Sequence, residues 1–130
     1  MAWRERGYRG VVALSLALTG SLAQAGPYSA MYVFGDSLSD VGNDALVSGT
    51  AIPPKSVFTD GTTTGRFTNG QNYADGLAGY LGLSIAPSLA GGTNYAYGGA
   101  RVNGITPALV PLGGKSFSQQ IGTYVTSLSA

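Results

Sequence analysis

Two short apolar segments alternate with two segments of helical periodicity, and this alternation limits the folds that the chain can adopt. Residues 30–34 (AMYVF) and 93–97 (TNYAY) each end at glycine, as short buried strands do. Residues 73–81 and 117–128 carry apolar side chains three and four positions apart, the spacing of one helix face. The order strand–loop–helix–strand–loop–helix predicts right-handed crossovers in a parallel sheet, which is an α/β fold.

The ends of both predicted helices are marked in the sequence. Gly82 follows the first helix as a C′ residue, and Ser116 with Gln119 has capping-box spacing at the start of the second. Residues 44–69 are rich in Gly, Thr, Pro and Ser, so we expect a long surface loop there. A further loop with Gly and Pro is expected up to Gly114.

Two strands and two helices leave much of a parallel sheet uncovered, because such a sheet is buried on both faces. We therefore expect the 130 residues to be the N-terminal part of a larger, truncated domain.

The first 25 residues are predicted to be a secretory signal peptide. Three arginines lie within the first nine positions, residues 11–23 are mainly apolar, and Ala23-Gln24-Ala25 gives a small-x-small cleavage pattern. A transmembrane anchor is the alternative, but polar residues interrupt the apolar stretch and it falls short of the ~20 residues that a span needs. We expect residues 26–130 to be an exported domain without a membrane span, whether periplasmic, secreted or at the cell surface.

The composition excludes several classes of function. Residues 26–130 carry four basic and five acidic side chains, so no basic patch is available for a nucleic acid backbone. The absence of Cys excludes disulfides and thiolate metal sites, and we expect neither a metal nor a cofactor. The chain also contains no His, the side chain that most often acts as a general base.

The segment 33–43 (VFGDSLSDVGN) has the pattern of a catalytic turn. A buried strand would deliver Gly-Asp-Ser to the C-terminal edge of the sheet, where open α/β sheets bind ligands. Gly35 permits a tight turn, and backbone N–H groups near Ser37 would favour a developing oxyanion. An isolated Gly-Asp-Ser is more often a plain turn in which Asp and Ser bond to the backbone.

The longer string resembles block I of the GDSL (SGNH) lipase/esterase family. Three further segments resemble the family in the same order, and together they extend the likeness over about residues 32–127: 64–70 (TGRFTNG), 94–100 (NYAYGGA, block II) and 118–121 (SQQI). The resemblance implies the N-terminal part of a three-layer α/β/α SGNH-hydrolase (flavodoxin-like) fold with a parallel sheet, from a secreted bacterial member. It also implies hydrolysis of carboxylic esters, with a small-molecule or lipid-like ester as substrate.

The resemblance assigns roles only at matching positions. Ser37 would be the nucleophile and, through its backbone N–H, one oxyanion donor, and Gly99 rather than Gly98 would be a second donor. Supporting roles in shaping the turn fall to Asp36, Asp40 and Asn43. Outside these positions, Arg66 and Arg101 could touch a substrate carboxylate but are expected to be solvated surface charges, and Tyr95 and Tyr97 are expected to pack as residues of the second strand.

The chain departs from the family pattern after Ala100. The block III Asn and the C-terminal Asp-x-x-His, which supplies the base, are both absent. A serine hydroxyl is a poor nucleophile without a proton acceptor, and loss of a triad member leaves only about 10³–10⁴-fold acceleration. The spacing of Lys55 and Lys115 does not support a Ser–Lys arrangement. We therefore expect the 130-residue chain alone to be inactive.

Two other functions stay open from the sequence. The chain could be a non-catalytic secreted binding module that keeps the SGNH fold, which predicts cooperative melting without ester turnover. A flavodoxin-like phosphate binder using the Gly-Asp-Ser turn is disfavoured, because the chain lacks a Gly-rich P-loop and a basic partner nearby.

Overall fold

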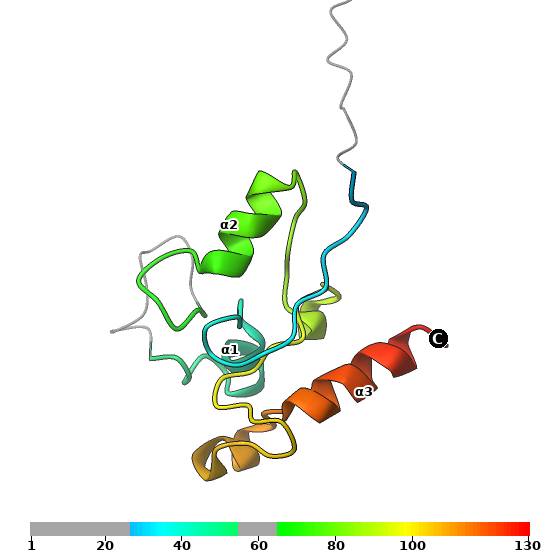
Figure 1. The fold of residues 1–130 in the computed structure, drawn as a ribbon. Helices are drawn as coiled ribbons and strands as arrows, with labels where there is room; N and C mark the ends of the chain where they lie inside the picture. The colour runs from blue at the N-terminus through cyan, green and yellow to red at the C-terminus, as the bar shows by residue number, and fades with distance from the viewer. Residues whose placement is uncertain (1–26, 55–64) are drawn as a thin grey trace, which may run out of the picture.

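The computed structural model describes residues 27–54 and 65–130, so the predicted signal peptide and Lys55 lie outside the described residues. The described part holds three α-helices and two 3₁₀-helices: α1 (Asn43–Val47), α2 (Tyr73–Tyr80), η1 (Ser88–Ala90), η2 (Pro107–Leu112) and α3 (Phe117–Ser127). In Figure 1, α1 lies between α2 and α3. None of the helices in this part of the chain has the length and apolar content that a membrane crossing requires.

Helix α2 begins and ends as its sequence predicts. Asn72 caps the first turn by accepting two backbone N–H groups, and Asp75 accepts the Asn72 N–H at 2.9 Å. The helix stops where Gly82 adopts a left-handed φ of 69°, and Leu83 N–H then donates to the Ala78 carbonyl at 2.8 Å. The predicted C′ glycine is therefore confirmed.

Helix α3 confirms the predicted capping box. Gln119 N–H donates to Ser116 Oγ at 3.3 Å, and Ser116 N–H donates back to Gln119 Oε1 at 2.8 Å. The apolar stripe of α3 then packs onto the two predicted strand segments. The Tyr124 ring lies 5.6 Å from that of Phe34 and 5.7 Å from that of Tyr95, both in edge-on geometry.

The two predicted strands are not formed in the described part of the chain. The segments lie side by side and parallel, but they meet only as an isolated bridge between Val33 and Asn94. Tyr95 N–H donates to the Val33 carbonyl at 2.7 Å, and Tyr97 N–H donates to the Gly35 carbonyl at 3.2 Å. Short parallel pairs are weak without further strands beside them. The strand prediction is therefore wrong here, although the parallel direction is correct.

Helix α1 corrects the predicted loop 44–69 at its N-terminal end. The Asp40 carboxylate accepts the N–H groups of Gly42 and Asn43 at 2.7 Å and that of Asp44 at 3.1 Å. A carboxylate in this position satisfies the N–H groups of a first helical turn, so a short helix forms where composition alone indicates a loop. Residues 55–64 of the predicted loop lie outside the described residues.

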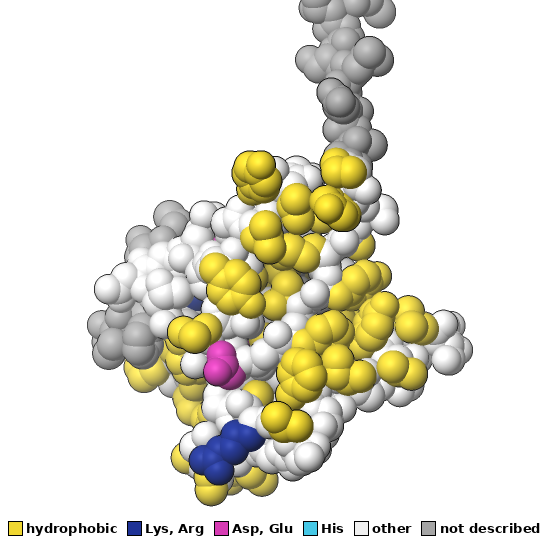
Figure 2. Space-filling model, in the orientation of Figure 1, with side chains coloured by type: hydrophobic (Ala, Val, Ile, Leu, Met, Phe, Trp, Pro, Cys, Tyr) yellow, Lys and Arg dark blue, Asp and Glu magenta, His cyan; other side chains and the backbone are white. Residues whose placement is uncertain are grey.

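Helix α2 contributes its small alanines to the core, whereas its predicted apolar stripe is largely exposed. The cluster of buried residues is Val33, Val41 and Ala74. Small alanines face this core, whereas three members of the stripe, Tyr73, Leu77 and Tyr80, are 59%, 45% and 87% exposed. Figure 2, in the orientation of Figure 1, shows apolar side chains gathered over the region of α2 and over that of α3.

Candidate active site

The Gly-Asp-Ser segment forms a tight turn that presents Ser37. The Asp36 carbonyl accepts the N–H groups of Ser39 and Asp40, both at 3.0 Å, and its Oδ1 accepts the Leu38 N–H at 3.0 Å. Gly35 has a φ of 150°, and a Cβ there would come within 2.8 Å of Ser39 Oγ. The turn therefore requires glycine before Asp36, as the motif indicates.

Ser37 is half-buried and opens onto one hollow of about 310 Å³. The other lining residues come from the same turn, from the segment before α2 and from the start of α2: Leu38, Phe67, Thr68, Gln71, Asn72 and Tyr73. Among the described residues, the Ser37 N–H donates no hydrogen bond, so it is available to a ligand.

The second predicted donor lies in a glycine turn with a left-handed backbone. Gly99 has a φ of 68°, and its carbonyl accepts the Thr106 N–H at 3.0 Å. Its own N–H donates no hydrogen bond within the described residues. Gly98 N–H, in contrast, donates to Asp44 Oδ2 at 2.8 Å. Of the two glycines, only Gly99 thus keeps a free backbone donor.

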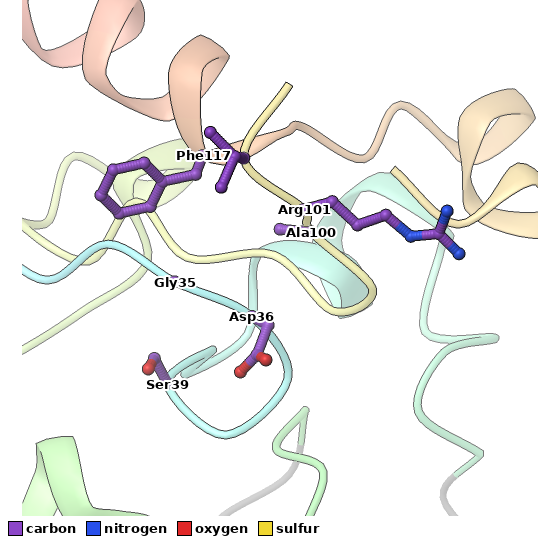
Figure 3. A pocket seen from close by; sticks show the side chains of 7 residues that line it. Gly35, Asp36, Ser39, Ala100, Arg101 and Phe117 are labelled. Atoms are coloured by element: carbon purple, nitrogen blue, oxygen red, sulfur yellow. The ribbon is translucent and has the colours of Figure 1, made fainter. Parts of the chain in front are cut away.

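A second hollow of about 350 Å³ joins the serine turn to the residues after the glycine turn (Figure 3). Gly35, Asp36 and Ser39 line it from one side, and the residues from Ala100 to Val102 together with Phe117 complete it. Ser37 and Gly99 are not among its lining residues. The structure thus brings their chain neighbours Asp36 and Ala100 together, but it does not bring both predicted donors into one hollow.

Two buried asparagines hold the serine turn, α1 and the second predicted strand segment together. Asn43 Nδ2 donates to the carbonyls of Asn94 and Ala96 at 2.8 and 3.0 Å, and its Oδ1 accepts the Leu89 N–H. Asn94 Nδ2 donates to the Ser39 carbonyl at 2.7 Å. Asn43 was expected to be structural, whereas Asn94 was not singled out, although it opens the NYAYGGA segment.

Gln120 is a buried residue of the site that sequence reasoning missed. Its Oε1 accepts the Gly35 N–H and its Nε2 donates to the Gly35 carbonyl, each at 2.8 Å. The only signal in the sequence was its place in the SQQI segment. This side chain ties α3 to the backbone just before the serine turn.

Asp40 and Asp44 form a buried pair of carboxylates behind the two turns. Burial raises the pKa of Asp40, and this effect is larger than the opposite effect of the three backbone N–H groups that donate to its carboxylate. Burial, and then the charge of Asp40, raises the pKa of Asp44 to about 7. Burial and these two carboxylates raise the pKa of Tyr97 to about 12.

Arg66 corrects the expectation of a solvated surface charge. Its guanidinium makes a two-pronged ion pair with Asp75 of α2, in which Nε donates to Oδ2 at 2.6 Å and Nη2 donates to Oδ1. The two side chains are only 14% and 7% exposed. The planar guanidinium matches a carboxylate in this geometry, so Arg66 anchors the described part of the TGRFTNG segment, residues 65–70, to α2. Arg101 is exposed, as expected.

Neither a base for Ser37 nor a metal site is found in the described part of the chain. Lys115 Nζ donates to Thr123 Oγ1 on α3 at 2.9 Å, and Lys115 lines neither of the two hollows at the serine turn. Residues 27–54 and 65–130 hold no group of three or more His, Cys, Asp or Glu side chains that could bind a metal ion.

One predicted strand segment thus ends in a Gly-Asp-Ser turn that carries Ser37, and the other ends in a glycine turn with a free N–H at Gly99. Residues 31–129 match the family described as GDSL-like Lipase/Acylhydrolase. The chain therefore belongs to the GDSL-like lipase/acylhydrolase family.

Comparison with individual proteins gives the same assignment. The chain is 34% identical over 116 residues to a GDSL esterase/lipase of Arabidopsis thaliana, covering 76% of the chain and 35% of that relative. It is 38% identical over 91 residues to Lipase 1 of Photorhabdus luminescens, covering 70% of the chain and 12% of the relative. The chain thus spans about a third or less of the length of these relatives.

Proposed function

We propose that this chain forms the nucleophile-bearing part of a serine esterase or lipase with an SGNH fold. Ser37 Oγ attacks the carbonyl carbon of a carboxylic ester, and a base accepts its proton. The alcohol leaves with that proton when the tetrahedral intermediate collapses to an acyl-enzyme. Water then attacks the acyl-enzyme, releases the acid and restores the Ser37 hydroxyl.

One observation carries this proposal: the two backbone N–H groups assigned to the oxyanion hole make no hydrogen bond among the described residues. The Ser37 N–H and the Gly99 N–H are both free, although their neighbours Leu38 and Gly98 donate to side-chain oxygens. Both residues are half-buried, so a ligand can reach these two N–H groups from solvent. An ester oxyanion is a ligand of the required charge.

The proposed base lies outside these 130 residues, because the chain contains no His. The matched relatives are about three times as long as the matched segment or longer, which leaves room for a catalytic Asp and His. The test is to read the coding sequence beyond Ala130 and to express the complete frame. The proposal requires an Asp-x-x-His in that frame or a shifted one.

The kinetic test compares variants in that complete protein. Ser37→Ala is expected to lower turnover of a chromogenic ester by about 10³-fold or more, as removal of a serine nucleophile does. Ser84→Ala is the matched control, because Ser84 is exposed and lies away from both turns in sequence. Equal turnover in the two variants would exclude Ser37 as the nucleophile.

We further propose that the protein is an exported bacterial member of the family. The arginine-rich start, the short apolar stretch and Ala23-Gln24-Ala25 support export. Residues 1–40 fused to a reporter that is active only after export should give reporter activity, with a mature N-terminus at Gly26. An inactive, uncleaved fusion would refute export.

A non-catalytic binding module is the second candidate, favoured by the absence of His from the chain. It predicts cooperative melting of the chain and no Asp-x-x-His in the complete frame. Ester turnover that depends on Ser37 would exclude it.

A further inference from the structure

Asp44 is a buried carboxylate that plays no part in the proposed chemistry, yet it directly contacts the glycine turn of Gly98 and Gly99. It is 2% exposed, and its Oδ2 accepts the Gly98 N–H at 2.8 Å. Gly98 immediately precedes Gly99, the proposed second donor. A Cβ at Gly98 would collide with this carboxylate and lie 2.6 Å from the Phe67 ring. The glycine turn therefore rests against Asp44.

A short chain of hydrogen bonds continues from Asp44 to the serine turn. Asp44 N–H donates to Asp40 Oδ2 at 3.1 Å, and Asp40 N–H donates to the Asp36 carbonyl at 3.0 Å. That carbonyl closes the turn that carries Ser37. Asp40 and Asp44 are both buried, so water does not compete for these bonds. The two turns are thus linked through the first turn of α1.

We infer that Asp44 is a positioning residue, which fixes the Gly98–Gly99 turn relative to the Ser37 turn without touching substrate. Its catalytic consequence rests on the proposed function, whereas its effect on the glycine turn does not. A carboxylate oxygen is suited to this task because it accepts a backbone N–H strongly and cannot donate when ionised.

The surroundings of Asp44 make its hydrogen bond to Gly98 sensitive to pH. Two acidic groups face it, Asp40 and Tyr97, and the positive charge of Arg66 acts on Asp40, whose pKa it lowers. Burial and the charge of Asp40 raise the pKa of Asp44 to about 7. As Asp44 ionises, its hydrogen bond to the Gly98 N–H strengthens, because charged acceptors form stronger bonds.

The experiment follows the backbone amides of Gly98 and Gly99 by NMR in the ¹⁵N-labelled full chain. In the wild type, the Gly98 amide should titrate with a midpoint near pH 7. Asp44→Asn should keep Gly98 protected, because its Oδ1 still accepts, but abolish the titration. Asp44→Ala should shift both amides and speed hydrogen exchange at Gly98 by about tenfold or more, as loss of one bond does.

Asp75→Asn is the matched control, since it removes a carboxylate from the Arg66 ion pair but has no bond to Gly98. Gly98 and Gly99 amides that respond to Asp44→Ala no more than to Asp75→Asn would overturn the inference. If Asp44→Ala does not fold, a Gly98 titration near pH 7 that persists in Asp44→Asn would overturn it equally.

The kinetic readout uses the complete protein. Asp44→Ala should lower kcat toward the ~10²-fold cost of a lost oxyanion donor while KM changes little, and Asp44→Asn should recover most of that loss. An Asp44→Ala enzyme with wild-type kcat would overturn the positioning role even if Ser37→Ala abolishes turnover. Amides that respond as expected while Ser37→Ala keeps turnover would support the role of Asp44 and refute the proposed function.

Discussion

The Gln120 side chain binds both backbone groups of Gly35, accepting its N–H and donating to its carbonyl at 2.8 Å each. The carboxamide thereby bonds both backbone groups of the residue two before Ser37, whose carbonyl also accepts the Tyr97 N–H at 3.2 Å. Helix α3 is fixed to the serine turn by this pairing, in addition to the aromatic contacts of Tyr124.

Gln120→Ala should lower the free energy of unfolding by about 2 kcal/mol, because it leaves the Gly35 N–H without a partner and removes one of the two donors to the Gly35 carbonyl, which still accepts the Tyr97 N–H. The measurement is urea denaturation of the full chain. Gln119→Ala is the matched control: Gln119 is exposed and serves the capping box, so its loss should cost about 1 kcal/mol. Equal losses in the two variants would contradict the role of Gln120.

Asn43→Asp should destabilise the chain by at least about 3 kcal/mol. The new carboxylate would face the carbonyls of Asn94 and Ala96, which now accept from the Asn43 amide. Asn69→Asp makes the same chemical change at an exposed site and should stay within about 0.5 kcal/mol of the wild type. Thermal melting of both variants measures the difference, and a mild Asn43→Asp would show that the amide does not bridge these carbonyls.

Gly98→Ala should be strongly destabilising, whereas Gly76→Ala should stabilise. A Cβ at Gly98 would meet the Asp44 carboxylate and the Phe67 ring, but a Cβ at Gly76 meets nothing within 4 Å. In the helical Gly76 position, alanine should gain about 0.5–1 kcal/mol. Chemical denaturation of the two variants tests this, and a Gly98→Ala chain of wild-type stability would contradict the close approach.

The stability advantage of Asp44→Asn over the wild type should grow as pH rises from about 4 to about 7. Asp44 has a pKa of about 7 in the folded chain against 3.8 as its ordinary value, so the folded state binds the proton more tightly. The stability from this group is complete below pH 4 and is lost as pH rises through 7, with a slope of at most about 1.4 kcal/mol per pH unit. Asparagine cannot titrate, so the difference between the two chains should change with pH. A constant difference would show that Asp44 is not held neutral.

Local signals in the sequence predicted the local parts of this structure. The capping box at Ser116 and the C′ position of Gly82 depend on a few neighbouring residues, and both are found as predicted. The strands depend on partners elsewhere in the chain, and the segments at Val33 and Asn94 meet only in one isolated bridge. The pattern within a segment does not show whether further strands lie beside it, so the sequence predicted strands in two segments that form only a bridge.

In the candidate site, too, local contacts were predictable from the sequence and long-range contacts were not. The Gly-Asp-Ser turn was predictable because its hydrogen bonds return to Asp36 itself. Gln120 and Asp44 act on glycines 85 and 54 positions away, and no local pattern encodes such contacts. Arg66 was misjudged for the same reason, since its partner Asp75 shows its role only once α2 is in place.

The most direct test of the account is the rate of ester hydrolysis by the complete protein with and without the hydroxyl at position 37. We expect Ser37→Ala to lower kcat by about 10³-fold or more while the protein stays folded. A Ser37→Ala protein that hydrolyses the ester at the wild-type rate would contradict the account.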